Sequence, residues 1–328
     1  SVIMSKIWVR FLILFGVLGI TFFFCLTGFR PGDGDKVGAE GEQTRIICFL
    51  SGASGMNQIN TEITRGLEEQ SGQSDRAALS VYNYDDFEDR TFTGGVETFL
   101  AMQGDVMIAF GTNEAGQAAE LVENNQVKLI LLDTDTPDHP EERIAFIGTD
   151  NRGAVREIIQ SVKENVPEAN AAVFITHQHS TTFLRRDALQ DLTDQDPAIQ
   201  IENIYYISSD SIEAFTQMRE ILSENPEINT VLCLDGFSSQ TAASVIPAMD
   251  QDYYTVGFDI SDYTVKALEN GDFDLLVSQD YDQMGKMAVE IATNYQEGEE
   301  AVEIYRPCDF YTQENAEELA EEYFHGEA

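Results

Sequence analysis

Polar side chains stand at the ends of two apolar segments in the middle of the chain. The segment VKLILLD (127–133) ends on Asp133, and the next apolar segment ends on GTDN (148–151). Open sheets of parallel strands bind their ligands at the carboxyl ends of the strands, where carboxylate and amide groups can hydrogen-bond to a ligand. The two segments therefore predict a ligand-binding site at the edge of a parallel sheet.

The residue types that catalyse reactions or hold metal ions do not form a recognisable set. The sequence has no G-x-S-x-G, no P-loop, no H-E-x-x-H and no G-x-G-x-x-G after its first apolar segment. His177 and His179 lie two residues apart, but the sequence nominates no further metal ligand for them. The four cysteines show neither metal-binding nor disulfide spacing. We therefore predict a binding protein with no enzyme activity, no metal ion and no cofactor.

From residue 44 onward, short apolar segments alternate with longer amphipathic ones. Segments typical of strands are found at 45–50, 78–84, 105–111, 127–133, 171–176, 199–207, 230–235, 253–259 and 275–279. Segments with helical periodicity lie between most of them, for example 115–126, 153–165 and 238–249. This alternation predicts an α/β architecture of parallel strands and crossover helices, arranged in two successive sets.

Length and charge limit the partners of the chain. Its 328 residues are enough for two domains of ordinary size. With 58 acidic against 19 basic side chains, the formal net charge is −39. Such a charge opposes binding to the phosphates of nucleic acids and to anionic lipid surfaces. Nucleic acid is therefore not expected as a partner.

The first 30 residues have the pattern of a membrane-targeting segment. Lys6 and Arg10 precede residues 11–29, which carry no charge. This stretch exceeds the usual core of a cleaved signal peptide, so its length favours an uncleaved membrane anchor. Cleavage and lipidation at Cys25 are the alternatives. All three place the rest of the chain outside the cytoplasm, attached to the outer face of the cell membrane or secreted, and residues 31–43 have the composition of a flexible tether.

Five segments, in this order, resemble motifs of the periplasmic sugar-binding proteins, the ribose-binding type of solute receptors of ABC transporters. They are LLDT (131–134), IGTDN (147–151), ENPEINTVLCLDG (224–236), TVGFDIS (255–261) and LLVSQDYDQMGKMAVE (275–290). The resemblance implies the type I periplasmic-binding-protein fold, in which two similar doubly wound parallel-sheet lobes are joined by a three-strand hinge. The lobes would comprise 44–150 plus 280–304, and 151–279 plus 305–328.

The resemblance also implies a set of ligand-binding residues in the cleft between the lobes. Carboxylates and an amide can bind sugar hydroxyls there, and a guanidinium can clamp them with its fork of donors. The family's ligand contacts fall on Asp133, Asp235, Asp259, Gln279 and Arg185. The alternatives are that an aspartate after a strand caps the next helix, and that Arg185 lies on the surface facing nearby acidic residues.

The sequence departs from the family at two positions that concern the ligand. Residues 54–60 (SGMNQIN) lack the aromatic pair that stacks on the sugar in relatives, and Thr134 replaces an arginine. Asn57 and Asn60 are candidates for polar contacts to the ligand, and Phe237 is a candidate stacking surface. The identity of the sugar is left open.

Two functions are consistent with these features. The first is an extracytoplasmic, monomeric solute-binding protein that closes on a small sugar and delivers it to an ABC permease. The second is a membrane-anchored sensor of the same fold that signals to a histidine kinase.

Overall fold

The structure is a computed structural model. It describes residues 43–325 except 53–55, 113, 137–141, 195 and 197. The predicted targeting segment, and the tether apart from its last residue, lie outside the described residues. Within the described part, no helix combines the length and the apolar character needed to span a membrane.

The first lobe is built on a six-stranded sheet in which every strand pair is parallel. The strand order is β11-β5-β4-β3-β1-β2. The strands are β1 (Thr44–Leu50), β2 (Ala77–Asn83), β3 (Val106–Phe110), β4 (Leu129–Leu132), β5 (Ala145–Thr149) and β11 (Val302–Arg306). The central strands are buried along their whole length, as expected for a parallel sheet covered on both faces.

In the described part of this lobe, four helices cover the two faces of the sheet. They are α2 (Asn57–Gly72), α3 (Phe92–Ala101), α4 (Ala119–Asn124) and α10 (Tyr281–Asn294). One apolar cluster joins α2 and α10 to one face, and a second joins α3 and α4 to the other. On α2 the buried residues Ile59, Ile63 and Leu67 are four positions apart, which places them on one side of the helix.

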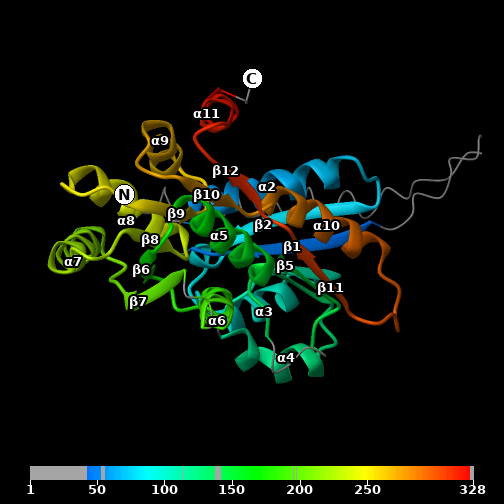
Figure 1. Cartoon of the computed structure of the whole chain (residues 1–328). Coiled ribbons are helices and arrows are strands. Elements are labelled where there is room, and N and C mark those ends of the chain that lie inside the picture. Colours follow the sequence, from blue (N-terminus) through cyan, green and yellow to red (C-terminus); the bar gives the residue numbers. More distant parts are fainter. Residues whose placement is uncertain are drawn as a thin grey trace, which may run out of the picture. The chain divides into compact units, whose positions relative to one another are not determined.

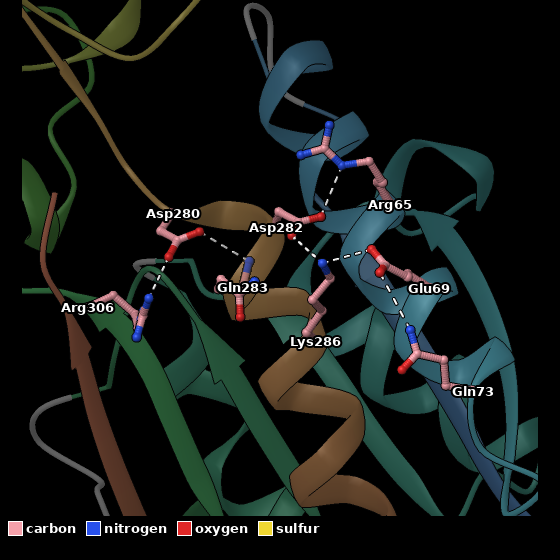
Figure 2. Close-up of polar contacts among 8 residues, drawn as sticks. All are labelled: Arg65, Glu69, Gln73, Asp280, Asp282, Gln283, Lys286 and Arg306. Atoms are coloured by element: carbon pink, nitrogen blue, oxygen red, sulfur yellow. Dashed lines mark hydrogen bonds and ion pairs between the residues drawn. The ribbon is translucent and has the colours of Figure 1, made fainter. Parts of the chain in front are cut away.

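Two glycines let α2 and α10 approach closely. A Cβ added to Gly66 of α2 would lie 1.9 Å from the backbone oxygen of Asp282, and one added to Gly285 of α10 would lie 2.5 Å from that of Ile63. Since real Cβ atoms do not come so near to another heavy atom, the contact requires residues without side chains. The ion pairs that Asp282 and Lys286 make with α2 flank this contact (Figure 2).

The second lobe repeats the arrangement with one difference. Its sheet has the order β12-β10-β9-β8-β6-β7, and the edge strand β12 is antiparallel whereas the other pairs are parallel. The strands are β6 (Ala169–Ile175), β7 (Ile199–Tyr206), β8 (Thr230–Cys233), β9 (Tyr254–Phe258), β10 (Leu275–Ser278) and β12 (Asp309–Tyr311). The helices are α5 (Asn151–Asn165), α6 (Ser180–Thr193), α7 (Ser211–Glu224), α8 (Gly236–Val245), α9 (Asp262–Asn270) and α11 (Ala316–His325). Apolar clusters again lie on both faces.

The chain crosses between the lobes after β5, after β10 and after β11, so segments distant in sequence share a sheet (Figure 1). Three hydrogen bonds join the crossovers. Asp150 donates its backbone N–H to the carbonyl of Arg306 (2.8 Å), Thr149 Oγ1 donates to Gln279 Oε1 (2.7 Å), and Arg306 Nη2 donates to Asp280 Oδ2 (2.6 Å; Figure 2). The domain boundary expected at residue 304 falls within β11, which continues in the first sheet to Arg306.

Candidate ligand-binding site

Residues of both lobes line a cavity of about 100 Å³. The cavity lies at the carboxyl ends of the strands. Its lining residues come directly or shortly after β4, β6, β8, β9 and β10. Most of the predicted ligand-binding residues are among those that line it, namely Asp133, Arg185, Asp235, Phe237, Asp259 and Gln279.

Asp133 and Asp259 occupy equivalent positions in the two lobes. Asp133 directly follows β4 and Asp259 directly follows β9, with φ angles of 62° and 66°. Their backbone N–H groups donate to the carbonyls of Ile147 (2.9 Å) and Val277 (2.8 Å) on the neighbouring strands. Left-handed backbone is uncommon for residues other than glycine, and aspartate is one of the types that tolerate it. The same turn thus presents one buried carboxylate from each lobe to the cavity.

The carboxylate of Asp133 is only partly hydrogen-bonded. Its Oδ2 accepts from Thr134 Oγ1 at 3.1 Å, whereas its Oδ1 is buried without a hydrogen-bond partner among the described residues. Burial raises the pKa of Asp133, and the positive charge of Arg185 opposes this rise. Leaving a buried polar atom unpaired costs about 1–3 kcal/mol. A ligand that donates a hydrogen bond to Oδ1 would remove this cost.

Asp259 has a similar environment. Its Oδ1 accepts a hydrogen bond of 2.6 Å from Gln279 Nε2. Burial raises the pKa of Asp259 to about 6; Arg185 acts against the rise, while the negative charges of Asp133 and Asp235 add to it. The proton affinity of this carboxyl therefore depends on what else occupies the cavity.

Gln279 uses its whole side-chain amide within the protein. Its oxygen accepts from Thr149 Oγ1 (2.7 Å) and from Arg185 Nη2 (2.8 Å). Its nitrogen donates to Asp259 Oδ1 and to the hydroxyl of Tyr281, each at 2.6 Å. Because an amide offers two donors and two acceptor positions, none is left over for a ligand. Gln279 lines the cavity and connects the two lobes, but its role here is to hold Arg185 and Asp259 in place.

Arg185 is buried rather than paired with acidic residues at the surface; it is 2% exposed. Its Nε donates to Asn151 Oδ1 (2.7 Å) and its Nη1 to the carbonyl of Leu234 (2.8 Å). The guanidinium carbon lies 4.0 Å from the ring centre of Phe258, a cation–π arrangement. Of its five N–H groups, the bonds to Asn151, Leu234 and Gln279 occupy one each, so the remaining ones are available to a ligand.

Asp235 acts mainly as a helix cap. Its Oδ1 accepts from the backbone N–H of Ser238 (2.8 Å) at the start of α8, and its Oδ2 accepts from those of Thr176 (2.6 Å) and His177 (3.0 Å). This is the capping alternative considered from the sequence. Asp235 borders the cavity, and its bonds fix the loop that follows β6.

Aromatic rings form part of the wall on the side of the second lobe. His177 and His179 stack with ring centres 5.5 Å apart, and Phe237 meets His177 edge to face at 5.9 Å. Burial lowers the pKa of His179, and the neighbouring His177 lowers it further. The ring pair lines the cavity from the loop before α6. Within the described residues, no cluster of three or more His, Cys, Asp and Glu side chains is suited to a metal ion.

Asn57 and Asn60 lie elsewhere. Both belong to α2 and line a different pocket, together with Arg65 and Glu68. Asn60 Nδ2 donates to the carbonyl of Ser51 at 2.7 Å, so its amide supports the end of β1. The structure therefore does not bring these two asparagines to the interlobe cavity, because their side chains leave α2 on another side.

Sequence reasoning missed several cavity residues, among them Phe110, Thr181 and Tyr281. Phe110 is the last residue of β3, so the strand-end rule that selected Asp133 could have found it. Thr181 and Tyr281 lie in the first turns of α6 and α10, and only the packing of the two lobes shows that these helix ends face one cavity.

Comparisons with known proteins identify the family. A model described as a periplasmic binding protein domain matches residues 48–300. No curated protein matches the chain.

Solved structures of low sequence identity share the fold. An ABC transporter solute-binding protein from Bacillus halodurans C-125, solved with myo-inositol, is 19% identical with a TM-score of 0.70, covering 85% of this chain and 98% of that one. A periplasmic ribose ABC transporter protein from Conexibacter woesei is 18% identical with a TM-score of 0.71, covering 85% and 95%. A LacI-type transcriptional regulator from Bacteroides fragilis is 15% identical with a TM-score of 0.71, covering 84% and 99%. The predicted family and fold are confirmed: the chain belongs to the periplasmic binding protein family and has its type I fold of two α/β lobes.

Proposed function

We propose that this protein is an extracytoplasmic receptor that encloses one small sugar or cyclic polyol between its lobes and delivers it to an ABC transporter. The observation that carries the proposal is the pair Asp133 and Asp259, which present buried carboxylates from both lobes to one cavity. Polyol hydroxyls can donate to these oxygens, and the free N–H groups of Arg185 can donate to polyol oxygens. The myo-inositol bound to the Bacillus halodurans protein is a molecule of this class.

The arrangement of the crossovers suits a receptor that opens and closes. Ligand entry requires the lobes to separate, and hinge motion is absorbed by a few residues at the ends of elements. The crossovers near Asp150, Asp280 and Arg306 are short and are joined to one another by hydrogen bonds. Closure would bring Asp133 and Arg185 around one ligand, and ligand binding would in turn favour the closed form.

A thermal-unfolding screen over neutral monosaccharides and inositols tests the proposal. A ligand that binds only the folded state stabilises it by about 2.7 kcal/mol at a concentration of 100 Kd, so the Tm should rise. We expect Asp259→Ala to fold and to lose the ligand-dependent rise. Asp191→Ala is the matched control, because the Asp191 side chain is 67% exposed on α6 and lies away from the cavity lining.

An unchanged rise in the Asp259→Ala variant would remove this residue from the site. Absence of stabilisation by every polyol tested would contradict the proposed ligand class. Delivery to a permease is a separate step, tested by uptake of the identified ligand in cells with and without the gene. The sensor alternative has no observation of its own among the described residues, so transport is the function we propose.

A further inference from the structure

The charged groups that line the interlobe cavity do not balance. Its described lining contains the carboxylates of Asp133, Asp235 and Asp259 but only one guanidinium, that of Arg185. All four residues are at most 9% exposed. Among the described residues, one more guanidinium is nearly buried, that of Arg143, but it is held by Asp135 and Glu303 and does not line the cavity.

One of the three carboxylates is compensated locally. Asp235 accepts three backbone N–H groups, one of them at the start of the ten-residue helix α8. Hydrogen bonds of this kind, together with the positive end of a helix, stabilise a negative charge. Asp235 therefore needs no further counter-ion.

The remaining two carboxylates share a single cation. Arg185 directs its hydrogen bonds to Asn151, Leu234 and Gln279, and makes no ion pair with Asp133 or Asp259 within the described structure. Its charge acts on both aspartates from a distance, as their pKa values reflect. One guanidinium can offset one of the two negative charges, so the closed cavity retains one in excess. A buried charge without a counter-ion is unfavourable, so the carboxylate either takes up a proton or binds a cation.

An independent observation locates where a cationic group would bind. Asp133 Oδ1 is buried and unpaired, and the polar groups around this carboxylate are the hydroxyls of Thr134 and Thr181. Thr134 Oγ1 and Thr181 Oγ1 also lie 3.2 Å apart and so share their single protons between several acceptors. The carboxylate therefore has an acceptor position and no donor of its own to fill it.

We propose that the natural ligand is a polyol with one protonated amine, such as an amino sugar or an aminocyclitol, and that its ammonium group donates to Asp133 Oδ1. The single positive charge of the ligand balances the excess carboxylate, and its hydroxyls use the free N–H groups of Arg185. The formal charge of −39 on the chain also attracts a cation toward the cavity. This inference rests on the proposed function and narrows its ligand class.

Calorimetric titration of the full chain at pH 7.5 with matched probes tests the inference. The first set of probes is glucosamine, its neutral parent glucose and its acetylated form N-acetylglucosamine. The second set is an aminocyclitol and its neutral parent myo-inositol. We expect an amine to bind at least about tenfold more tightly than its neutral parent, because a charge-assisted hydrogen bond is roughly twice as strong as a neutral one. N-acetylation, which removes the charge, should abolish the advantage. Repeating the titration in buffers of different ionisation enthalpy should show no proton uptake beyond the fraction of the free amine that is unprotonated at this pH.

Variants locate the charge. Asp133→Asn should reduce amine affinity by at least about tenfold and affect the neutral parent less. Asp191→Asn removes the same charge from the surface of α6 and should leave both affinities unchanged. Thermal unfolding of each variant without ligand establishes that it folds. If Asp133→Asn does not fold, the comparison of amine and neutral probes on the unmodified chain still tests the inference.

The outcomes separate the inference from the proposed function. Neutral polyols that bind as tightly as amines, or that bind with uptake of one proton, overturn the inference and leave the proposed function standing. In the second case a proton taken up by Asp133, Asp259 or His179 of the cavity replaces the positive charge of the ligand. Binding of neither class overturns both.

Discussion

At the scale of single residues, side chains that look alike in the sequence have different hydrogen bonds in the cavity and therefore different roles. Asp133, Asp235 and Asp259 each follow a strand, yet Asp235 is occupied by three backbone N–H groups and Asp133 keeps an unpaired oxygen. Gln279 is fully hydrogen-bonded within the protein. The difference lies in which donors the surrounding backbone supplies. Asp133 and Asp259 are therefore the carboxylates with capacity for a ligand.

The raised pKa of Asp259 has a consequence for the apo protein. The pKa of Asp259 is about 6 in the folded state, against a reference value of 3.8 for the unfolded chain. Between these two pH values the folded state therefore binds more protons than the unfolded state. Stability therefore falls as pH rises from about 4 to 6, by roughly 1.4 kcal/mol per unit of pKa difference. Asp259→Asn should remove this loss and stabilise the apo protein at pH 7 by about 2–3 kcal/mol.

Urea unfolding of the apo protein and of the Asp259→Asn variant at pH 4.5 and pH 7 measures this effect. Asparagine tolerates left-handed backbone, and its oxygen can still accept from Gln279, so the substitution changes little besides the charge. Equal stability differences at both pH values would show that Asp259 titrates normally.

At the scale of elements, the contact between α2 and α10 attaches the returning chain to the first lobe. Gly66 and Gly285 bring the two backbones together, and Met284, Ala288 and Val289 of α10 join the apolar cluster of α2. The ion pairs that surround this contact are partly exposed and contribute little by themselves. The position of α10 and of the crossover before it therefore depends on the close packing.

Gly66→Ala should destabilise the protein although alanine favours helix. In a helix interior this change normally stabilises by up to about 1 kcal/mol. Here the new Cβ would meet the backbone of Asp282, and overpacking of this kind costs about 1–3 kcal/mol, so a net loss is expected. Gly72→Ala at the end of the same helix is the control, because no atom lies within 4 Å of its Cβ position. Chemical unfolding of both variants measures the contrast, and equal stabilities would contradict the packing argument.

At the scale of the whole molecule, the large negative net charge affects the stability of the folded state. A net charge of −39 repels itself in the compact state, and this repulsion acts over the Debye length, about 30 Å at 0.01 M salt and 8 Å at 0.15 M. The two lobes can carry this charge because each has apolar clusters on both faces of its sheet.

Raising NaCl from 0.01 to 0.15 M should increase the Tm of the apo protein by several degrees, because salt screens the self-repulsion. Sodium sulfate matched for ionic strength separates this screening from the general effect of salts on apolar burial, which becomes strong only at higher concentration. A Tm that is flat over this range would mean that favourable ion pairs cancel the repulsion.

The amino-acid sequence by itself determined the α/β class, the family and the positions of most strands. Apolar runs such as 127–133 and 230–235 are short and rich in Val, Ile and Leu, which favours buried strands, and this composition can be read from the residues themselves. Asp133 and Asp259 could be selected for the same reason, because they end such runs.

The tertiary structure alone decided the rest. The strands β11 and β12 are short and carry exposed or partly exposed residues, so their apolar pattern is weak and their pairing with neighbouring strands defines them. The fate of Gln279 depends on Thr149 and Arg185, which lie 130 and 94 positions away in the chain. Asn57 and Asn60 line another pocket, because the packing of a helix decides in which direction its side chains point. Hydrogen-bond partners that meet only when distant parts of the chain fold together leave no mark in the local sequence.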